Sequence, residues 1–168
     1  MELFVIRHAI AAPLGRGNEF TDEKRALTIE GRDRMREVVK GLIKLRVEFD
    51  LILTSPLARA TETAELVAAA YDNSPPPQVL PVLATGVAAA EAVSALRAFA
   101  KQSEVMIVGH EPQLGAIASI LLTGASDVAH FKLKTGGCIA IDLPARFERG
   151  GGELRWMLTH RQLRQMRK

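Results

Sequence analysis

The chain has 168 residues, of which 48% are hydrophobic and 24% charged, and 22 Lys and Arg against 19 Asp and Glu give a net charge of +3. This composition predicts one globular domain over residues 1–168. The charge is too small to indicate a nucleic acid partner, although it suits an anionic small substrate. The single cysteine, Cys138, excludes an intramolecular disulfide and a cysteine-rich metal cluster, and it fits a reducing compartment.

No targeting or membrane-spanning segment is expected. The N-terminus lacks the basic region and the long apolar region of a signal peptide. The longest apolar stretch, LGAIASILLTGA, falls short of the roughly 20 residues that a bilayer requires. We therefore expect a cytoplasmic protein without a membrane partner.

Strand-like and helical patterns alternate along most of the chain. Nearly continuous hydrophobic runs predict strands covered on both faces at 2–7, 49–55 and 104–110. Apolar and alanine-rich helical patterns predict helices over 28–47, 56–72, 88–101 and 112–122. QVLPVL (78–83) predicts a short strand after a run of three prolines.

The pattern changes in the last quarter of the chain. HFKLK, CIAIDL and ELRWMLT predict strands, and ERGGGE predicts a turn between the last two. The proline run, the glycine run and the basic tail RQLRQMRK are not interpreted as linkers to other domains. We therefore expect a three-layer α/β fold with a mostly parallel central sheet, helices on both faces and an antiparallel strand pair near the C-terminus.

Cationic side chains follow the three clearest strands. Arg7 and His8 end the first, Arg59 lies in TSPLARATET after the second, and His110 follows the third. Ligands of parallel sheets bind outside the carboxyl ends of the strands. Ser55 is a natural helix N-cap and Pro56 a natural first residue, so Arg59 is expected near the positive end of a helix. The pattern predicts a cradle for phosphate or sulfate.

These motifs closely resemble the histidine phosphatase superfamily, which has the phosphoglycerate mutase-like fold. The matching residues are Arg7-His8, Ser55-Pro56-x-x-Arg59-Ala60-x-x-Thr63 and Gly109-His110. The short length and VGHEP look most like its small phosphohistidine phosphatase (SixA-type) branch, and RALTIEG (25–31) resembles a segment of that branch. The resemblance implies that His8 is a nucleophile that becomes transiently phosphorylated, and that Arg7, Arg59 and His110 bind the phosphoryl group.

The residues themselves are consistent with these roles. Nearby cations lower the pKa of an imidazole, which keeps it neutral and nucleophilic. Phosphoryl transfer depends on positioning and electrostatic stabilisation, so no metal and no cofactor are expected. The histidines lack metal-ligand spacing, and His130 and His160 are interpreted as structural.

Two positions depart from the phosphoglycerate mutase pattern. Ala9 stands where the family usually has glycine, and we infer that the position tolerates a methyl group on the pocket floor. The stretch LPVLATG (80–86) lacks the glutamate acid of mutases, and the next carboxylate is Glu91. A missing acid favours a phosphoramidate over an alkyl phosphate, because an alkoxide must be protonated as it leaves. Asp22, Glu23, Glu91 and Glu111 remain candidates for an acid.

Three functions are therefore compared. The first is a phosphohistidine phosphatase acting on a histidine-phosphorylated protein, which an open site with little cap over it would suit. The second is a phosphomonoesterase for a small metabolite, which needs an acid from the 12–27 loop or from Glu91. The third is a phosphate-binding module without turnover, and the presence of both arginines and both histidines argues against it.

Overall fold

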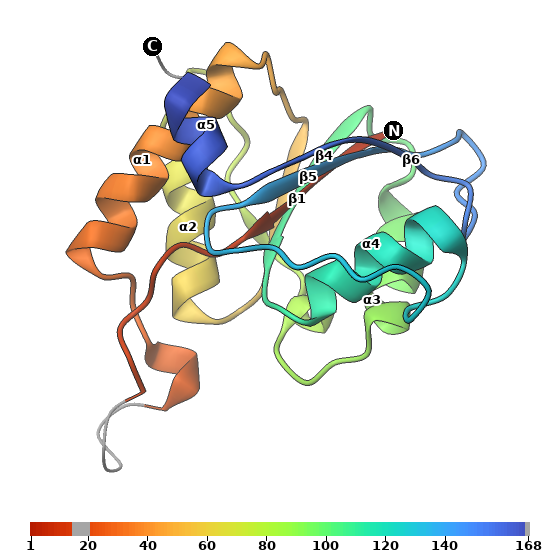
Figure 1. The fold of residues 1–168 in the computed structure, drawn as a ribbon, viewed down its shortest axis with the longest axis horizontal. Helices are drawn as coiled ribbons and strands as arrows, with labels where there is room; N and C mark the ends of the chain where they lie inside the picture. The colour runs from red at the N-terminus through yellow and green to blue at the C-terminus, as the bar shows by residue number, and fades with distance from the viewer. Residues whose placement is uncertain (15–20, 167–168) are drawn as a thin grey trace.

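The computed structural model describes residues 1–14 and 21–166. Its centre is a six-stranded sheet in the order β3-β2-β4-β1-β5-β6 (Figure 1). The strands are β1 (Glu2–Arg7), β2 (Leu51–Thr54), β3 (Gln78–Val79), β4 (Glu104–Gly109), β5 (Cys138–Asp142) and β6 (Glu153–Leu158). β1 to β4 run parallel, whereas β5 is antiparallel to both of its neighbours. The mostly parallel sheet and the antiparallel β5–β6 pair are as expected.

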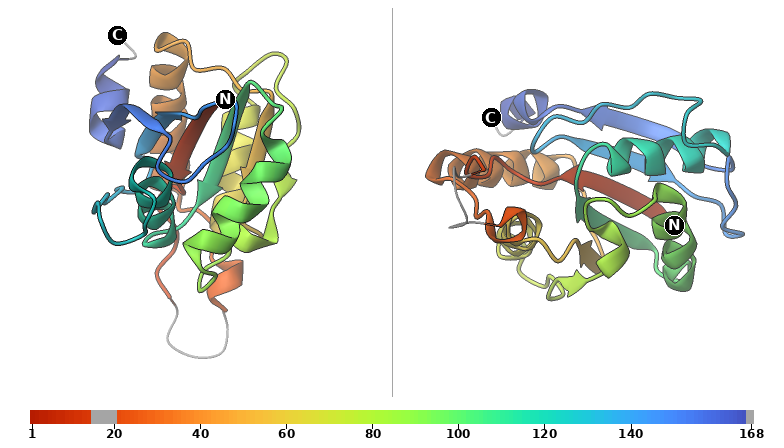
Figure 2. Two further views of the ribbon diagram at one scale, coloured as in Figure 1. Left: turned by 90° about the vertical axis from the view of Figure 1, so that its right-hand side faces the viewer. Right: turned by 90° about the horizontal axis from the view of Figure 1, so that it is seen from below.

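Helices cover both faces of this sheet (Figure 2). They are α1 (Ile29–Lys44), α2 (Ala58–Ala68), α3 (Ala89–Leu96), α4 (Gln113–Thr123) and α5 (His160–Met166), with short 3-10 turns η1 (Asp22–Lys24), η2 (Pro81–Leu83) and η3 (Arg97–Phe99). None of the helices in the described part of the chain is long and apolar enough to cross a membrane.

Alternate residues of β1 enter two separate cores. Leu3 and Val5 pack in the cluster under α3 and α4, and Phe4 and Ile6 pack in the cluster under α1, α2 and α5. Successive side chains of a strand point to opposite faces, so a strand buried on both faces must be hydrophobic throughout. The three-layer α/β architecture is therefore confirmed.

The strand predicted at 130–134 is wrong. This segment is a loop whose backbone is bonded by side chains instead of by a neighbouring strand. The N–H of Leu133 donates to Glu111 Oε1 at 2.7 Å, and its carbonyl accepts from Arg7 Nη1 at 2.8 Å. Gly115 lets the loop approach α4, because a Cβ there would lie 2.2 Å from the carbonyl oxygen of Phe131.

Two helix boundaries also differ from the prediction. α2 begins at Ala58 with Leu57 as its N-cap, so Ser55 is not the cap. Most of the basic tail, where no helix is predicted, folds as α5, whereas residues 167–168 lie outside the described part. Leu163 of α5 is fully buried against the face formed by α1 and β6. A single buried leucine within a basic heptamer is too weak a periodic signal to predict this helix.

Packing of α5 on α1 generates a prediction at Gly41. A Cβ at this position would lie 2.1 Å from the carbonyl oxygen of Leu163, which is backbone and cannot rotate away. Gly41→Ala should therefore lower the free energy of unfolding by roughly 1–3 kcal/mol, although alanine is intrinsically better in a helix by about 1 kcal/mol. Urea unfolding followed by circular dichroism measures the change.

Lys44→Ala, at an exposed position of the same helix, is the matched control and should change stability by less than about 0.5 kcal/mol. Equal or greater stability of Gly41→Ala would contradict the close packing of α5.

Candidate active site

The carboxyl ends of three adjacent strands hold the four residues singled out from the sequence. Arg7 ends β1 and pairs in register with Gly109, which ends β4. The residues that follow, His8 and His110, therefore lie side by side, with ring centroids 5.1 Å apart. Arg59 lies in the first turn of α2, the helix that follows β2. The strand order thus brings the four residues together at one edge of the sheet.

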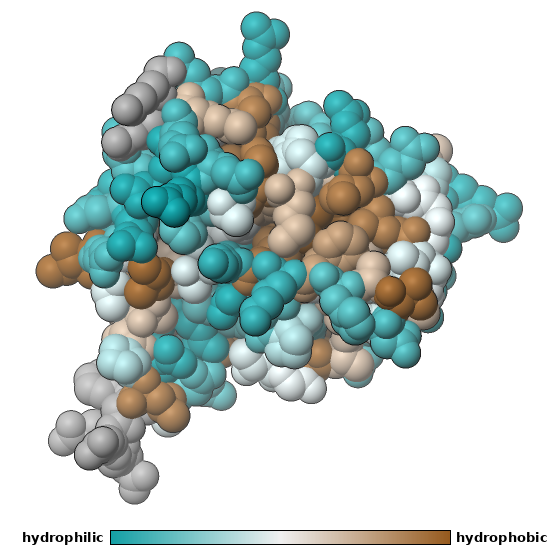
Figure 3. All heavy atoms as spheres, in the orientation of Figure 1, coloured by the Kyte–Doolittle hydropathy of each residue, from teal (hydrophilic) through white to brown (hydrophobic). Residues whose placement is uncertain are grey.

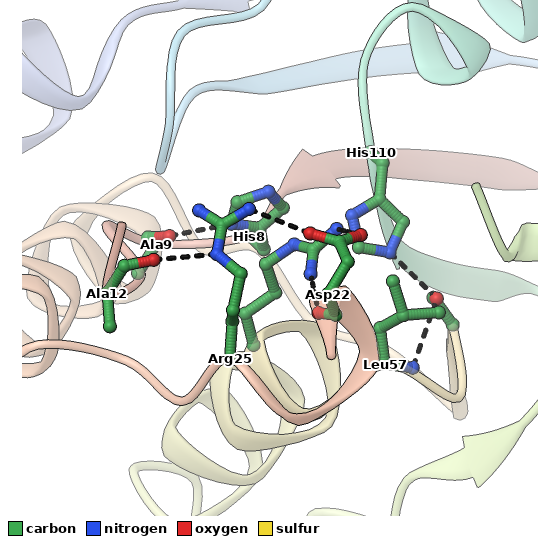
Figure 4. Close-up of polar contacts among 9 residues, drawn as sticks. His8, Ala9, Ala12, Asp22, Arg25, Leu57 and His110 are labelled. Carbon is green, nitrogen blue, oxygen red and sulfur yellow. Dashed lines mark hydrogen bonds and ion pairs between the residues drawn. The ribbon is translucent and has the colours of Figure 1, made fainter. Parts of the chain in front are cut away.

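His8 is oriented by its own backbone. Its Nδ1 lies 2.7 Å from the carbonyl oxygen of Ala9, which can only accept, so Nδ1 carries the hydrogen and Nε2 keeps its lone pair (Figure 4). Burial lowers the pKa of His8 to about 4, the hydrogen bond to Ala9 opposes that shift, and Arg59, Arg7 and Arg25 reinforce it. The result is a neutral imidazole with one free nitrogen, surrounded by cations.

Ala9 occupies the position of the family's usual glycine without strain. Among the described residues other than glycine, Arg46 alone has a positive φ, so Ala9 does not need the left-handed region. Its methyl group packs in the apolar cluster under α1 and α2 and is 3% exposed. Its N–H donates to Thr63 Oγ1 at 3.0 Å, and Thr63 Oγ1 donates to the carbonyl of Arg59 at 2.6 Å.

His110 is 2% exposed and has one ring nitrogen free. Its Nε2 lies 2.8 Å from Ser55 Oγ, which also accepts from the N–H of Leu57 at 3.3 Å. Its Nδ1 is buried without a hydrogen-bond partner among the described residues. Burial lowers the pKa of His110 to about 3, with repulsion from His8 and Arg59 adding to the shift. A neutral His110 can therefore offer one nitrogen to a ligand.

A carboxylate joins two guanidinium groups beside the histidines. Arg59 donates to the backbone oxygen and to Oδ2 of Asp22 at 2.7 and 3.0 Å, and Arg25 donates to Asp22 Oδ1 at 2.8 Å (Figure 4). Partial burial alone would raise the pKa of Asp22, but these bonds outweigh burial and lower it. The pair of guanidinium groups can bind a tetrahedral anion in the same way as it binds this carboxylate.

Arg25 was not among the residues predicted for the site. It lies at the start of RALTIEG, a segment noted only for its likeness to a family pattern. Its Nε donates to the carbonyl of Ala12 at 2.7 Å, which orients the guanidinium toward Asp22. The signal that could have identified it is Asp22-x-x-Arg25, an ion pair at i and i+3 that follows His8 in the sequence.

Arg7 is held at the edge of the cluster. Its Nη1 donates to Leu133, while its Nε is buried without a partner among the described residues. Of the other polar groups that the sequence singled out, Glu23, Glu91 and His130 are exposed, Glu111 binds the 130–134 loop and His160 begins α5. Within residues 1–14 and 21–166, no group of three His, Cys, Asp or Glu could hold a metal.

Comparisons with known proteins indicate the family of this chain. Residues 3–84 match the model of the histidine phosphatase superfamily (branch 1). An uncharacterized protein from Picosynechococcus sp. is 38% identical over 143 residues, which are 84% of each chain. The phosphohistidine phosphatase SixA of Escherichia coli is 28% identical over 95% of this chain and 94% of its own.

A solved structure shares the whole fold. The protein histidine phosphatase SixA complexed with tungstate superposes with a TM-score of 0.84 and 25% identity, covering 97% of this chain and 99% of its own. Sequence motif, strand-end geometry and fold thus agree, and the chain belongs to the histidine phosphatase superfamily, branch 1.

Proposed function

We propose that this phosphatase removes the phosphoryl group from phosphohistidine in a protein substrate, using His8 as the nucleophile. The observation that carries the proposal is the neutral His8 imidazole, whose Nδ1 is bonded to Ala9 and whose Nε2 is left free beside Arg7, Arg25 and Arg59. Likeness to SixA, both in sequence and in a solved structure, supports phosphohistidine as the substrate.

The reaction has two displacements. In the first, Nε2 of His8 attacks phosphorus, an N–P bond forms, and the bond to the leaving group breaks with its electron pair. In the second, water attacks phosphorus, the electron pair returns to Nε2, and inorganic phosphate leaves. The guanidinium groups of Arg7, Arg25 and Arg59 stabilise charge on the equatorial oxygens, and His110 offers Nδ1. Asp22 has to withdraw from Arg25 and Arg59 when phosphate enters.

The carboxylates near the site support a phosphoramidate substrate. A general acid typically contributes 10²–10⁴-fold when an alkoxide leaves. Asp22 is a poor acid because its two arginine partners lower its pKa. Glu91 and Glu23 are exposed, and Glu111 is bonded to Leu133. Imidazole departs more readily than an alkoxide, so a site without a positioned acid favours phosphohistidine.

The pKa of His8 gives a pH prediction. In uniformly ¹³C-labelled protein, the His8 ring signal should titrate with a midpoint near pH 4, whereas an ordinary histidine titrates at about 6.5. The unfolded chain takes up this proton below about pH 6.5, so the free energy of unfolding should decline from there toward pH 4. A midpoint near 6.5 would mean that the buried, cation-surrounded environment is absent in solution.

Removing the imidazole of His8 should abolish catalysis without abolishing the binding of phosphate. His8→Ala should abolish turnover while retaining tungstate or phosphate, since Arg7, Arg25 and Arg59 remain, and isothermal calorimetry measures that binding. Wild-type protein quenched during turnover should carry an acid-labile, alkali-stable phosphate at His8, which mass spectrometry locates. Label on a serine, or fast turnover without label, would refute covalent catalysis by His8.

Leaving-group dependence tests the substrate class. Phosphohistidine and p-nitrophenyl phosphate should be hydrolysed, and glycerol phosphate should react far more slowly because no acid protonates its alkoxide. Asp22→Asn and Glu91→Gln should each change the phosphohistidine rate by less than tenfold, or under about 1.4 kcal/mol in barrier. A hundredfold loss in either variant, or rapid hydrolysis of glycerol phosphate, would favour a phosphatase for small metabolites.

A further inference from the structure

A groove lined by cations lies outside the proposed catalytic cluster of Arg7, His8, Arg59 and His110. Its lining residues, called here the basic groove, are Arg34, Lys134, Thr159, His160, Arg161 and Arg164. No carboxylate lines it among the residues that the structure describes. Arg34 forms an ion pair with Glu30 along α1, whereas Lys134 and Arg161 are exposed. Figure 3 shows hydrophilic side chains gathered on this face, over α1 and α5.

The cations of the groove converge on one imidazole. Burial lowers the pKa of His160, and repulsion from Arg34, Arg164, Lys134 and Arg161 adds to the shift. Nδ1 of His160 and Nε of Arg164 are both buried without a partner in the described part of the chain. Like charges that share one depression repel each other, and an anionic ligand relieves that repulsion. The groove is therefore suited to several carboxylates or another polyanion.

The basic groove lies at the same end of the sheet as His8, because β5 begins and β6 ends beside the end of β1. Lys134 follows Leu133, the residue whose carbonyl accepts from Arg7. In the same turn, the N–H of Gly136 donates to the carbonyls of Arg7 and His8 at 3.0 and 3.3 Å. A small cavity shares Arg34 and His160 with the groove and is also lined by Ala9, the residue after His8, and by Gly136. A ligand in the groove and a group bound at His8 would therefore lie at the same end of the sheet.

We propose that the basic groove binds an acidic segment of the phosphorylated protein substrate, next to the phosphohistidine that enters the site. This inference rests on the proposed function, since a free metabolite would not extend from the site into the groove. Extended chain spans about 3.3 Å per residue, so a few residues beside the phosphohistidine reach Lys134 and the start of α5. Charge complementarity at such a rim mainly speeds association and selects among partners.

Two synthetic phosphohistidine peptides test the proposal. One carries Asp and Glu on both sides of the phosphohistidine, and the other carries Asn and Gln at the same positions. With the full-length protein at about 20 mM salt, kcat/KM should be about tenfold higher for the acidic peptide, and the preference should shrink at about 0.5 M, where charges are screened. Equal kcat/KM for the two peptides would overturn the proposal.

Charge-reversal variants test whether the basic groove causes the preference for the acidic peptide. Lys134→Glu with Arg161→Glu, both at exposed positions, should abolish the preference and leave phosphoramidate turnover within about twofold, because neither side chain touches the reacting group. The matched control is Arg97→Glu with Lys101→Glu, two exposed cations that precede β4 at the opposite edge of the sheet. It makes the same change in net charge and should keep the preference. A preference that survives in the groove variant would refute the assignment.

A binding measurement separates this inference from the proposed function. Fluorescence anisotropy with the unphosphorylated acidic peptide should show salt-sensitive binding to wild type and to the control, and none to the groove variant. If neither phosphopeptide is hydrolysed while p-nitrophenyl phosphate is, phosphohistidine activity fails, and so does the substrate role of the groove. Stronger groove-dependent binding to anionic vesicles or to RNA than to the peptide would contradict the proposal that the groove binds a protein.

Discussion

The parallel pairing of β1 with β4 is the constraint on which the proposed catalytic cluster of Arg7, His8, Arg59 and His110 depends. Register places Arg7 opposite Gly109, and the N–H of His8 donates to the carbonyl of Gly109 at 3.1 Å. His8 and His110 each follow their strand by one residue, so the register alone brings the two rings into contact. A shift by one residue would move one ring to the opposite face of the sheet, because side chains alternate along a strand. The buried cores on both faces prevent such a shift.

The repulsion among several cations gathered at one edge of the sheet has to be compensated. Backbone carbonyls accept from Arg7 and Arg25, and the carboxylate of Asp22 bridges Arg25 and Arg59. Burial keeps the two imidazoles neutral, so they add donors and a lone pair without adding charge. Asp22 thus bonds the two guanidinium groups, of Arg25 and Arg59, that a phosphoryl group is proposed to bind. Electrostatic stabilisation is most effective when the hydrogen-bond donors are held in position by bonds of this kind.

Loop 130–134 connects the catalytic cluster with the basic groove. Glu111 and Arg7 bond the two backbone groups of Leu133, and the next residue, Lys134, lines the groove. The turn that follows bonds the backbone of His8 through Gly136. A strand here would have used these backbone groups for a ladder. As a loop, the segment supports Arg7 from one side and presents a cation toward the neighbouring surface.

Local patterns in the sequence were sufficient for the fold class and for the proximity of four site residues. Hydrophobic runs and helical spacing are properties of neighbouring residues, so they predicted β1, β2, β4, α1 and α4 with small errors at the ends. The rule that parallel strands end at one edge then brought Arg7, His8, Arg59 and His110 together. The contribution of Arg25, the bridging position of Asp22 and the helix α5 were decided only by the tertiary structure.

The sequence did not reveal these features because the contacts that create them join residues far apart in the chain. Arg59 meets Asp22 across 37 positions of sequence, and Arg7 meets Leu133 across 126. Such bonds join a side chain to whatever group the folded chain brings near it, and they leave no periodic signal in either segment. The sequence by itself determined most of the strands and helices and which polar side chains follow the ends of the parallel strands. Only the tertiary structure decided which distant carbonyls and carboxylates bond to those side chains and orient them. These partners become neighbours only after the sheet has formed.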